Sequence, residues 1–153
     1  MLDDYKIVVS GDKWLAYGAI TTSRAITELT EGSKESLVLT IYIINNEDIL
    51  KRIREALIRN VVIDIYMYKM EDKYKWAYKY IEELDKEFSN LHVFVSTDEF
   101  IHAKVLIADG QSTLIGSANL TPSALSTNYE LGIQLNSEEI AWDVNKIIKN
   151  LIK

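Results

Sequence analysis

The chain has 153 residues, of which 48% are hydrophobic and 26% charged, and its formal net charge is −6 at pH 7. This length and composition predict one globular domain spanning residues 1–153, large enough to bury its own core, and they do not favour a second domain. The chain contains no cysteine, which excludes a disulfide framework and a thiolate metal site.

The N-terminal sequence Met-Leu-Asp-Asp-Tyr-Lys lacks the basic and apolar regions of a secretion signal. No apolar run elsewhere in the chain reaches the length that a membrane-spanning helix needs. We therefore expect a cytoplasmic protein that does not associate stably with a membrane.

The first part of the chain alternates between strand and helix patterns. Two β-rich runs, Tyr5–Ser10 and Lys13–Ile20, flank Gly11-Asp12 and predict an opening hairpin. Ser23 is expected to cap the first helix and Asn46 the second. The helices are predicted to end near residues 33, 60 and 88, and the strands to span residues 37–44, 61–68 and 91–96.

The second part of the chain is richer in strands. Residues 101–108 and 113–119 read as two strands, Thr121-Pro122 ends the second of them, and residues 122–125 predict a helical turn. Residues 129–136 read as a further strand, and Ser137 is expected to cap the last helix. This alternation predicts an α/β sandwich with a central mixed sheet covered by helices on both faces.

Inward-facing apolar positions of that last helix are expected at five residues. These are Ile140, Val144, Ile147, Ile148 and Leu151, which follow helical spacing.

The segment from residue 101 to residue 130 holds the residues of chemical interest. His102 and Lys104 are two apart in a strand pattern, so their side chains share a face. Asp109-Gly110 predicts a hairpin turn. If the loop is the four residues 109–112, Lys104 lies opposite Ser117 and His102 opposite Asn119, which brings four polar side chains together.

This set of side chains suits substitution at phosphorus. Negative charge grows on the non-bridging oxygens during the reaction, and donors such as Lys104, Ser117 and Asn119 stabilise it. A neutral imidazole such as that of His102 can attack phosphorus and divide one difficult displacement into two easier ones. A second acid must then protonate the departing oxygen, and no other group of the set titrates near neutral pH.

These residues resemble a known family. The spacing of His102 and Lys104, then Asp109, then Gly116-Ser117-x-Asn119 is similar to the HKD motif of the phospholipase D superfamily. The resemblance implies a phospholipase D-like fold and catalysis without metal or other cofactor.

The same resemblance implies a role for each site residue. His102 would form a phosphohistidine, Lys104 and Asn119 would bind the phosphoryl oxygens, and Ser117 would assist them. In the segment Asn128-Tyr129-Glu130, Glu130 would hold the imidazole of His102. Asp109, although part of the motif, would be mainly structural.

Family enzymes use two HKD motifs for each active site, and this chain has one. His92, its second histidine, is followed by Val-Phe-Val and lacks the rest of the motif. We therefore interpret His92 as a surface or hydrogen-bonded strand residue. The chain resembles the small single-motif endonucleases of the superfamily, which implies a homodimer whose active site lies on the two-fold axis and contains His102 from each copy.

The negative net charge weighs against a nucleic-acid substrate, because an acidic surface repels a polyanion unless its basic residues are clustered. One cluster is Lys51, Arg52, Arg54 and Arg59 on the second predicted helix. Another is the segment Lys69–Tyr80, where lysines alternate with aromatic residues, a combination that suits single-stranded nucleic acid. The apolar residues of that segment also follow helical spacing, which favours an ordinary helix packed on the core.

Three functions remain open. The first is a metal-independent nuclease that cleaves DNA or RNA. The second is a phosphodiesterase or phosphatidyltransferase that acts on a lipid headgroup, and the third is a non-catalytic dimeric module that binds nucleic acid. His102, Lys104 and Asn119 favour catalysis.

Overall fold

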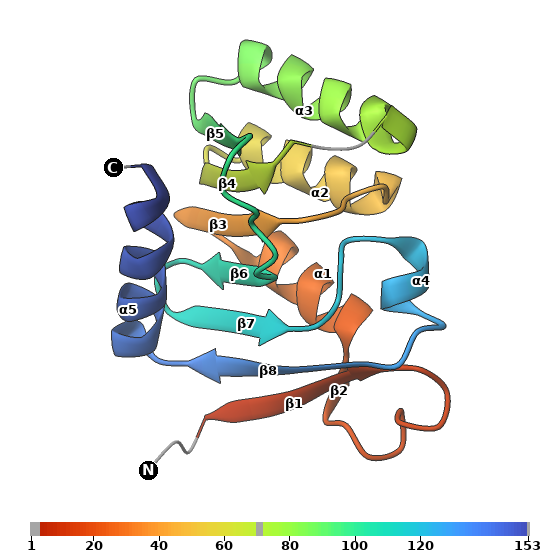
Figure 1. Cartoon of the computed structure of the whole chain (residues 1–153). Helices are drawn as coiled ribbons and strands as arrows, with labels where there is room; N and C mark the ends of the chain where they lie inside the picture. Colours follow the sequence, from red (N-terminus) through yellow and green to blue (C-terminus); the bar gives the residue numbers. More distant parts are fainter. Residues whose placement is uncertain (1–3, 70–71, 153) are drawn as a thin grey trace.

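In the computed structural model, residues 4–69 and 72–152 are described, and the strands among them form one mixed eight-stranded sheet (Figure 1). The spatial order is β2-β1-β8-β7-β6-β3-β4-β5. The strands are β1 (Tyr5–Ser10), β2 (Ile20–Thr21), β3 (Ser36–Ile41), β4 (Val62–Tyr68), β5 (Leu91–Ser96), β6 (Val105–Ala108), β7 (Ser112–Gly116) and β8 (Glu130–Asn136). The helices are α1 (Thr22–Gly32), α2 (Glu47–Ile58), α3 (Lys75–Glu87), α4 (Pro122–Leu125) and α5 (Glu138–Lys149), with short 3₁₀ turns η1 (Asp72–Tyr74) and η2 (Asn150–Ile152).

The sheet has a parallel half and an antiparallel half. Strands β3, β4 and β5 are parallel, and helices α2 and α3 connect them. Strands β6, β7 and β8 are antiparallel neighbours, and β6 joins the parallel half by pairing with β3. The predicted α/β sandwich with a mixed central sheet is therefore confirmed.

Helices cover both faces of the sheet. The larger core joins α1, α2 and α3 to one face, with fully buried side chains such as Leu37, Ile53 and Ile81. A smaller core joins Ala141 and Ile148 of α5 to Val38 and Ile107 on the other face. No helix within the described ranges combines the length and apolar character needed to cross a membrane.

The predicted opening hairpin is wrong. Strand β1 pairs antiparallel with β8, near the other end of the chain, and β2 is a two-residue strand parallel to β1. The loop between β1 and β2 lies against β1 at Gly18. A Cβ at this position would be 2.3 Å from a side-chain atom of Val9, so a larger residue would not fit there. A local pattern of β-rich residues around Gly11 could not indicate a partner strand more than a hundred residues away.

The helix caps agree with the sequence in two cases out of three. Asn46 accepts a hydrogen bond from the backbone N–H of Ile49, and Ser137 accepts one from Ile140. The cap of α1 is Thr21, whose hydroxyl accepts from the backbone N–H of Arg24, so the predicted cap at Ser23 is wrong. A side-chain oxygen at the cap satisfies an N–H of the first turn, and Thr21 serves this purpose two residues earlier.

Helix α5 buries a narrower stripe than its sequence predicts. Ile148 is buried and Val144 partly so, but Ile147 is 70% exposed and Leu151 is also exposed, so their predicted inward positions are wrong. The helix contacts the sheet along one line of residues that includes Ala141.

Candidate active site

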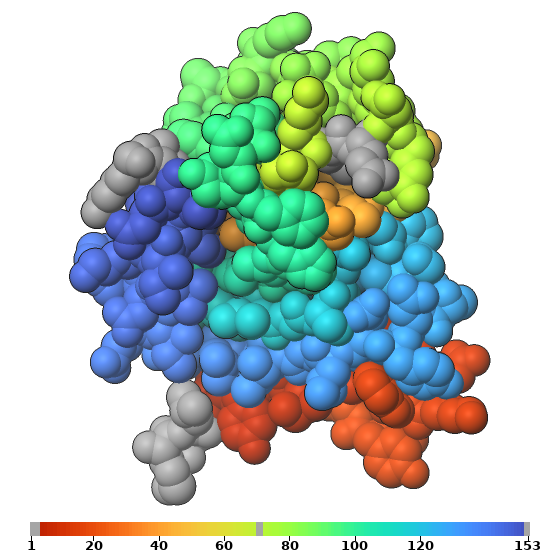
Figure 2. Space-filling model, viewed as in Figure 1, coloured from red at the N-terminus to blue at the C-terminus, as the bar shows by residue number. Residues whose placement is uncertain are grey.

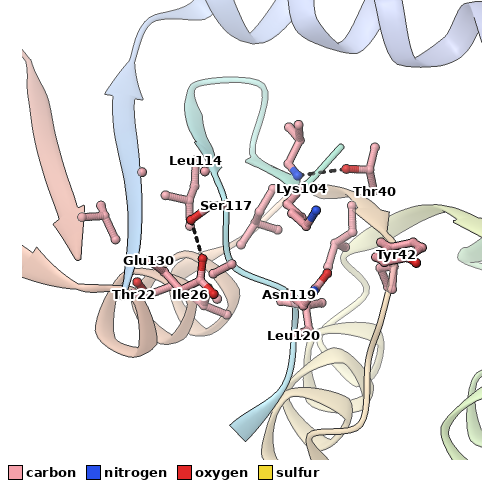
Figure 3. A pocket seen from close by; sticks show the side chains of 18 of the residues that line it. Thr22, Ile26, Thr40, Tyr42, Lys104, Leu114, Ser117, Asn119, Leu120 and Glu130 are labelled. Carbon is pink, nitrogen blue, oxygen red and sulfur yellow. Dashed lines mark hydrogen bonds between the residues drawn. The ribbon is translucent and has the colours of Figure 1, made fainter. Parts of the chain in front are cut away.

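The candidate site lies at the sheet edge where β6 begins, β7 ends and β8 begins (Figure 3). Lys104, Ser117, Asn119 and Glu130 line one cavity there, which has a volume of about 40 Å³. The floor of the cavity is apolar and comes from α1 and the larger core, including Ile26, Leu39 and Leu114. An apolar floor lowers the local dielectric constant, which strengthens the interaction of the polar groups with an anion.

The hairpin between β6 and β7 has a three-residue loop, so the predicted four-residue loop is wrong. Ala108 pairs with Ser112, and both Asp109 and Gly110 have positive φ, at 54° and 62°. Lys104 consequently lies opposite Gly116, whose N–H donates to the Lys104 carbonyl at 3.3 Å.

Three of the four polar side chains, those of Lys104, Ser117 and Asn119, meet at the cavity although this register differs from the expected one. His102 does not line the cavity and instead contacts Lys104. Strand β7 ends at Gly116, and the chain then leaves the sheet. Ser117 and Asn119 thereby reach the cavity that Lys104 lines. The end of the strand, not the pairing within it, brings these side chains together.

Two neighbouring contacts fix the segment that contains His102 and Lys104. The Thr40 hydroxyl donates to the Ala103 carbonyl at 2.8 Å and accepts from the Val105 N–H at 2.9 Å. Because Thr40 is buried in the middle of the sheet, this pair of bonds holds the start of β6 in place.

His102 is exposed at this edge and lies against Lys104. Lys104 Nζ is 3.1 Å from Nδ1 of His102 and donates to the His102 carbonyl at 2.9 Å. Two aromatic rings also contact the imidazole, that of Tyr42 at 4.6 Å between centroids and that of Phe100 at 5.8 Å. The imidazole is therefore oriented by its neighbours while remaining accessible to a ligand.

Burial lowers the pKa of Lys104, and the nearby Glu130 carboxylate partly opposes this change. The ammonium group is thus incompletely solvated in the free protein. An anion in the cavity would interact more strongly with such a group than with a fully hydrated lysine. Lys104 is suited to bind a phosphoryl oxygen.

Glu130 contacts Ser117. The Ser117 hydroxyl donates to Oε2 of Glu130, and the Leu131 N–H donates to the Ser117 oxygen at 3.1 Å. Asn128 Nδ2 lies 3.5 Å from the other carboxylate oxygen. Among the hydrogen bonds of the described residues none joins Glu130 to His102, so the structure gives Glu130 a different partner from the one implied by the resemblance.

Asn119 has an amide oxygen that is buried and has no hydrogen-bond partner among the described residues. A buried polar atom in this condition costs roughly 1–3 kcal/mol until a ligand or water satisfies its group. The amide lies at the cavity with Lys104, and because its oxygen is an acceptor, it would be satisfied by water or by a ligand that carries a hydrogen-bond donor.

Asp109 lies at the other end of the hairpin and joins it to the start of β3. Its carboxylate accepts hydrogen bonds from the backbone N–H groups of Lys34, Glu35 and Ser36 at 2.8–3.1 Å. Burial alone would raise the pKa of Asp109, but these donors and the Lys34 charge outweigh it, and the pKa is lowered. These contacts give Asp109 a structural environment away from the cavity.

Replacing Asp109 by alanine is expected to lower the free energy of unfolding by about 2 kcal/mol at pH 7, because three backbone donors lose their charged acceptor. The lowered pKa contributes stability above pH about 4, and this contribution is lost as the pH falls through the folded-state pKa. Urea unfolding of wild type and Asp109→Ala at pH 7 and pH 3 should show a smaller difference at pH 3. An equal difference at both values would contradict this account.

The aromatic residues that contact His102 were not identified from the sequence. Tyr42 follows the end of β3, and Phe100 precedes His102 by two residues. The alternation of Phe100, His102 and Lys104 along an extended segment was the available signal, since residues two apart share a face.

The other residues considered in the sequence have ordinary environments. His92 is hydrogen-bonded to Asp64 at 2.8 Å on neighbouring strands, which confirms its interpretation as a paired strand residue. In the basic cluster of α2, Arg52 and Arg54 form ion pairs with Glu31 and Glu87. Helix α3 packs on the core through the apolar stripe predicted for it, which includes the buried Ala77, Ile81 and Leu84.

The family model, curated relatives and a solved structure that match this chain point to the same family. A family model described as cardiolipin synthase, PLD-like domain, matches residues 26–152. Cardiolipin synthase A of Proteus mirabilis is 28% identical over 124 residues, which cover 78% of this chain and 25% of that protein. The DISARM protein DrmC of Bacillus paralicheniformis is 26% identical over 140 residues, which cover 86% of this chain and 54% of that protein.

The fold matches a solved structure along nearly its whole length. Nuc from Salmonella typhimurium, a phospholipase D family member, superposes with a TM-score of 0.79 at 18% identity, covering 96% of this chain and 92% of that one. The chain spans between about a quarter and about half of the length of the curated relatives above. Since the family model covers most of the chain and the architecture agrees, the protein belongs to the phospholipase D superfamily and has its phospholipase D-like domain.

Proposed function

We propose that this protein hydrolyses phosphodiester bonds of a nucleic acid, without a metal ion, through a phosphohistidine on His102. The observation that carries the proposal is the contact between exposed His102 and Lys104, because Lys104 lines a cavity together with Ser117, Asn119 and Glu130. The set combines an exposed nucleophile with a cation and neutral donors for the phosphoryl oxygens. Members of the superfamily to which the chain belongs are phosphodiesterases.

The first step forms a covalent intermediate. An imidazole nitrogen of neutral His102 attacks phosphorus, a P–N bond forms, and the P–O bond to the leaving strand breaks. The departing oxygen takes a proton from the imidazolium of His102 of the partner subunit. Lys104 and Asn119 stabilise the charge that develops on the non-bridging oxygens.

The second step returns the enzyme to its starting state. Water attacks the phosphorus and gives a proton to His102 of the partner subunit, and the P–N bond breaks to release neutral His102. One histidine must be neutral while the other is protonated, so the rate is expected to depend on pH along a bell-shaped curve.

A second copy of the chain is needed because one chain supplies one such histidine. The sheet face that carries α5 is uncovered beyond that helix, over β7, β8 and β1 (Figure 2). Ile115, Ile133 and Ile7 are neighbours across these strands, and Leu131 extends the patch. Leu131 is 54% exposed, and Ile7 and Ile115 are partly exposed.

This apolar patch adjoins the site, because Leu131 lines the same cavity as Glu130 and Ser117. A two-fold contact through the patch would place the two copies of the site next to each other and would remove apolar surface from water. Such an interface would bring the two His102 side chains near one another and would also cover the apolar patch.

A lipid headgroup is the second candidate substrate. The supporting observation is that a curated relative of this chain is named a cardiolipin synthase. The same histidine chemistry would then act on a glycerophosphodiester. The aromatic rings around His102 favour a nucleic acid, because bases stack on such rings.

One experiment separates these functions. Labelled single-stranded and double-stranded DNA and RNA, and vesicles of phosphatidylglycerol, are incubated with the protein in excess EDTA. We expect cleavage of at least one nucleic acid and no turnover of the lipid. Turnover of the vesicles alone would establish the lipid function, and binding of nucleic acid without turnover of any substrate would identify a non-catalytic module.

A further inference from the structure

Three aromatic side chains form a continuous cluster beside His102. The Phe100 ring lies 5.1 Å from that of Tyr42 and 4.9 Å from that of Tyr68, measured between centroids. The Tyr42 ring also contacts the imidazole, and the Phe100 ring is within 12° of parallel to it. We refer to Tyr42, Tyr68 and Phe100 as the aromatic platform.

The platform is assembled from three separate segments of the chain. Tyr42 follows β3, Tyr68 ends β4, and Phe100 belongs to the segment between β5 and β6. These strand ends are neighbours in the sheet, and the segment after β5 crosses in front of them (Figure 1). The Phe100 ring is therefore held by contacts with Tyr42 and Tyr68, which lie at the ends of two paired strands.

Phe100 is nevertheless 58% exposed and belongs to neither hydrophobic core of the described residues. Burying a phenylalanine side chain stabilises a fold, and this ring leaves much of its apolar surface in contact with water. An aromatic ring that is fixed at its edges and open on its surface is suited to stack a planar ligand.

The platform is continuous with the group expected to bind phosphate. Lys104 Nζ lies 5.4 Å from the centroid of the Tyr42 ring and beside His102. A phosphodiester held by Lys104 would therefore have its neighbouring nucleoside close to Tyr42 and Phe100.

We propose that the aromatic platform binds the nucleobase next to the scissile phosphate, with Phe100 as the main stacking surface, and thereby selects single-stranded nucleic acid. This rests on the function proposed above. In a duplex the bases are paired and stacked within the helix, so a base must be unstacked before it can reach an aromatic ring. A single strand offers its bases without this cost.

The charge of the chain supports stacking as a source of affinity. With a formal net charge of −6, the protein gains little from general attraction to a polyanion. Stacking of a base on an aromatic ring depends on contact between the rings and not on net charge. We therefore expect that binding of nucleic acid to this protein depends on the presence of bases. A basic nuclease at the same ionic strength would instead bind mainly through its charge.

The test is a cycle that removes each partner of the stacking contact. Wild type and Phe100→Ala are assayed in EDTA on a single-stranded oligonucleotide with one cleavage position, and on the same oligonucleotide lacking the adjacent base. On the intact substrate, Phe100→Ala is expected to lower kcat/KM about 10-fold. On the abasic substrate the two proteins should cleave at similar rates, because the contact is already missing.

Two further variants and a size measurement complete the test. Phe100→Tyr keeps a ring and should retain most of the activity on the intact substrate. Trp142→Ala removes another exposed aromatic ring, on α5, and should leave activity unchanged. The oligomeric state of each variant is measured by light scattering, and Phe100→Ala is expected to match wild type.

The outcomes distinguish this proposal from the function on which it rests. Equal losses for Phe100→Ala on intact and abasic substrates would overturn the platform while leaving nuclease activity established. A change in oligomeric state for Phe100→Ala would also overturn it, by assigning the ring to the subunit contact. Turnover by wild type of phosphatidylglycerol vesicles but of neither oligonucleotide would overturn the proposed function itself.

Discussion

Replacing His102 by alanine is expected to lower kcat by about 10⁴-fold or more, with little change in stability. The imidazole supplies the attacking atom in one subunit and the acid in the other, so the substitution removes both groups from a shared site. Loss of a nucleophile in comparable covalent mechanisms costs several orders of magnitude, and water replaces it poorly. Stability should change little, because His102 is exposed.

The matched control is His92→Ala, which removes the only other histidine of the chain. His92 is also exposed on a strand and is paired with Asp64. Initial rates in EDTA on the substrate found active for wild type compare the three proteins, and thermal unfolding verifies that all are folded. Activity of His102→Ala within 10-fold of wild type would exclude His102 as the nucleophile.

The second large effect is expected from a charge in the apolar patch. Leu131→Glu places a carboxylate on the sheet face that we assign to the subunit contact, where two copies of the charge would approach each other across the two-fold axis. Burying an unpaired charge costs several kcal/mol, so we expect the dimer to dissociate. Activity should fall about 100-fold or more with dissociation, because each monomer lacks the second histidine.

Ile58→Glu is the control for this substitution, since Ile58 is 55% exposed and lies at the end of α2, outside the patch. Sedimentation velocity and initial rates are measured over a range of protein concentrations. For Leu131→Glu, activity should recover in part as concentration rises and dimers re-form. A monomeric and fully active Leu131→Glu protein would contradict the shared site.

Local sequence patterns predicted the positions of strands and helices better than they predicted which strands pair with each other. Strand β5 has the predicted bounds, Leu91–Ser96, because an apolar run between polar turns defines it locally. The caps at Asn46 and Ser137 are local for the same reason. The pairing of β1 with β8 depends on contacts between distant parts of the chain, and adjacent β-rich runs suggested the wrong partner.

The site shows the same division between local and distant information. The motif identified Lys104, Ser117 and Asn119, and they do line one cavity. The four-residue loop that would have aligned them across the hairpin does not form. Asp109 and Gly110 both have positive φ and build a shorter turn, and the sequence Asp109-Gly110 is compatible with more than one turn type. Ser117 and Asn119 reach the cavity because the chain leaves the sheet after β7.

The aromatic platform could not be predicted from any one segment. Tyr42, Tyr68 and Phe100 lie at the ends of different elements, and each is unremarkable in its own sequence context. They meet because β3 and β4 are parallel and end at the same edge of the sheet. The parallel arrangement is a property of the whole fold.

The most direct test of the central claim is to trap the covalent intermediate. Wild-type protein is mixed in EDTA with a substrate that carries radiolabelled phosphorus at its cleavable linkages, and the reaction is stopped within one turnover by alkaline detergent. The account predicts protein-bound label that is stable in alkali, is lost in acid as a phosphohistidine is, and is absent from His102→Ala but present in His92→Ala. Rapid cleavage with no bound label, or label that persists in His102→Ala, would contradict it.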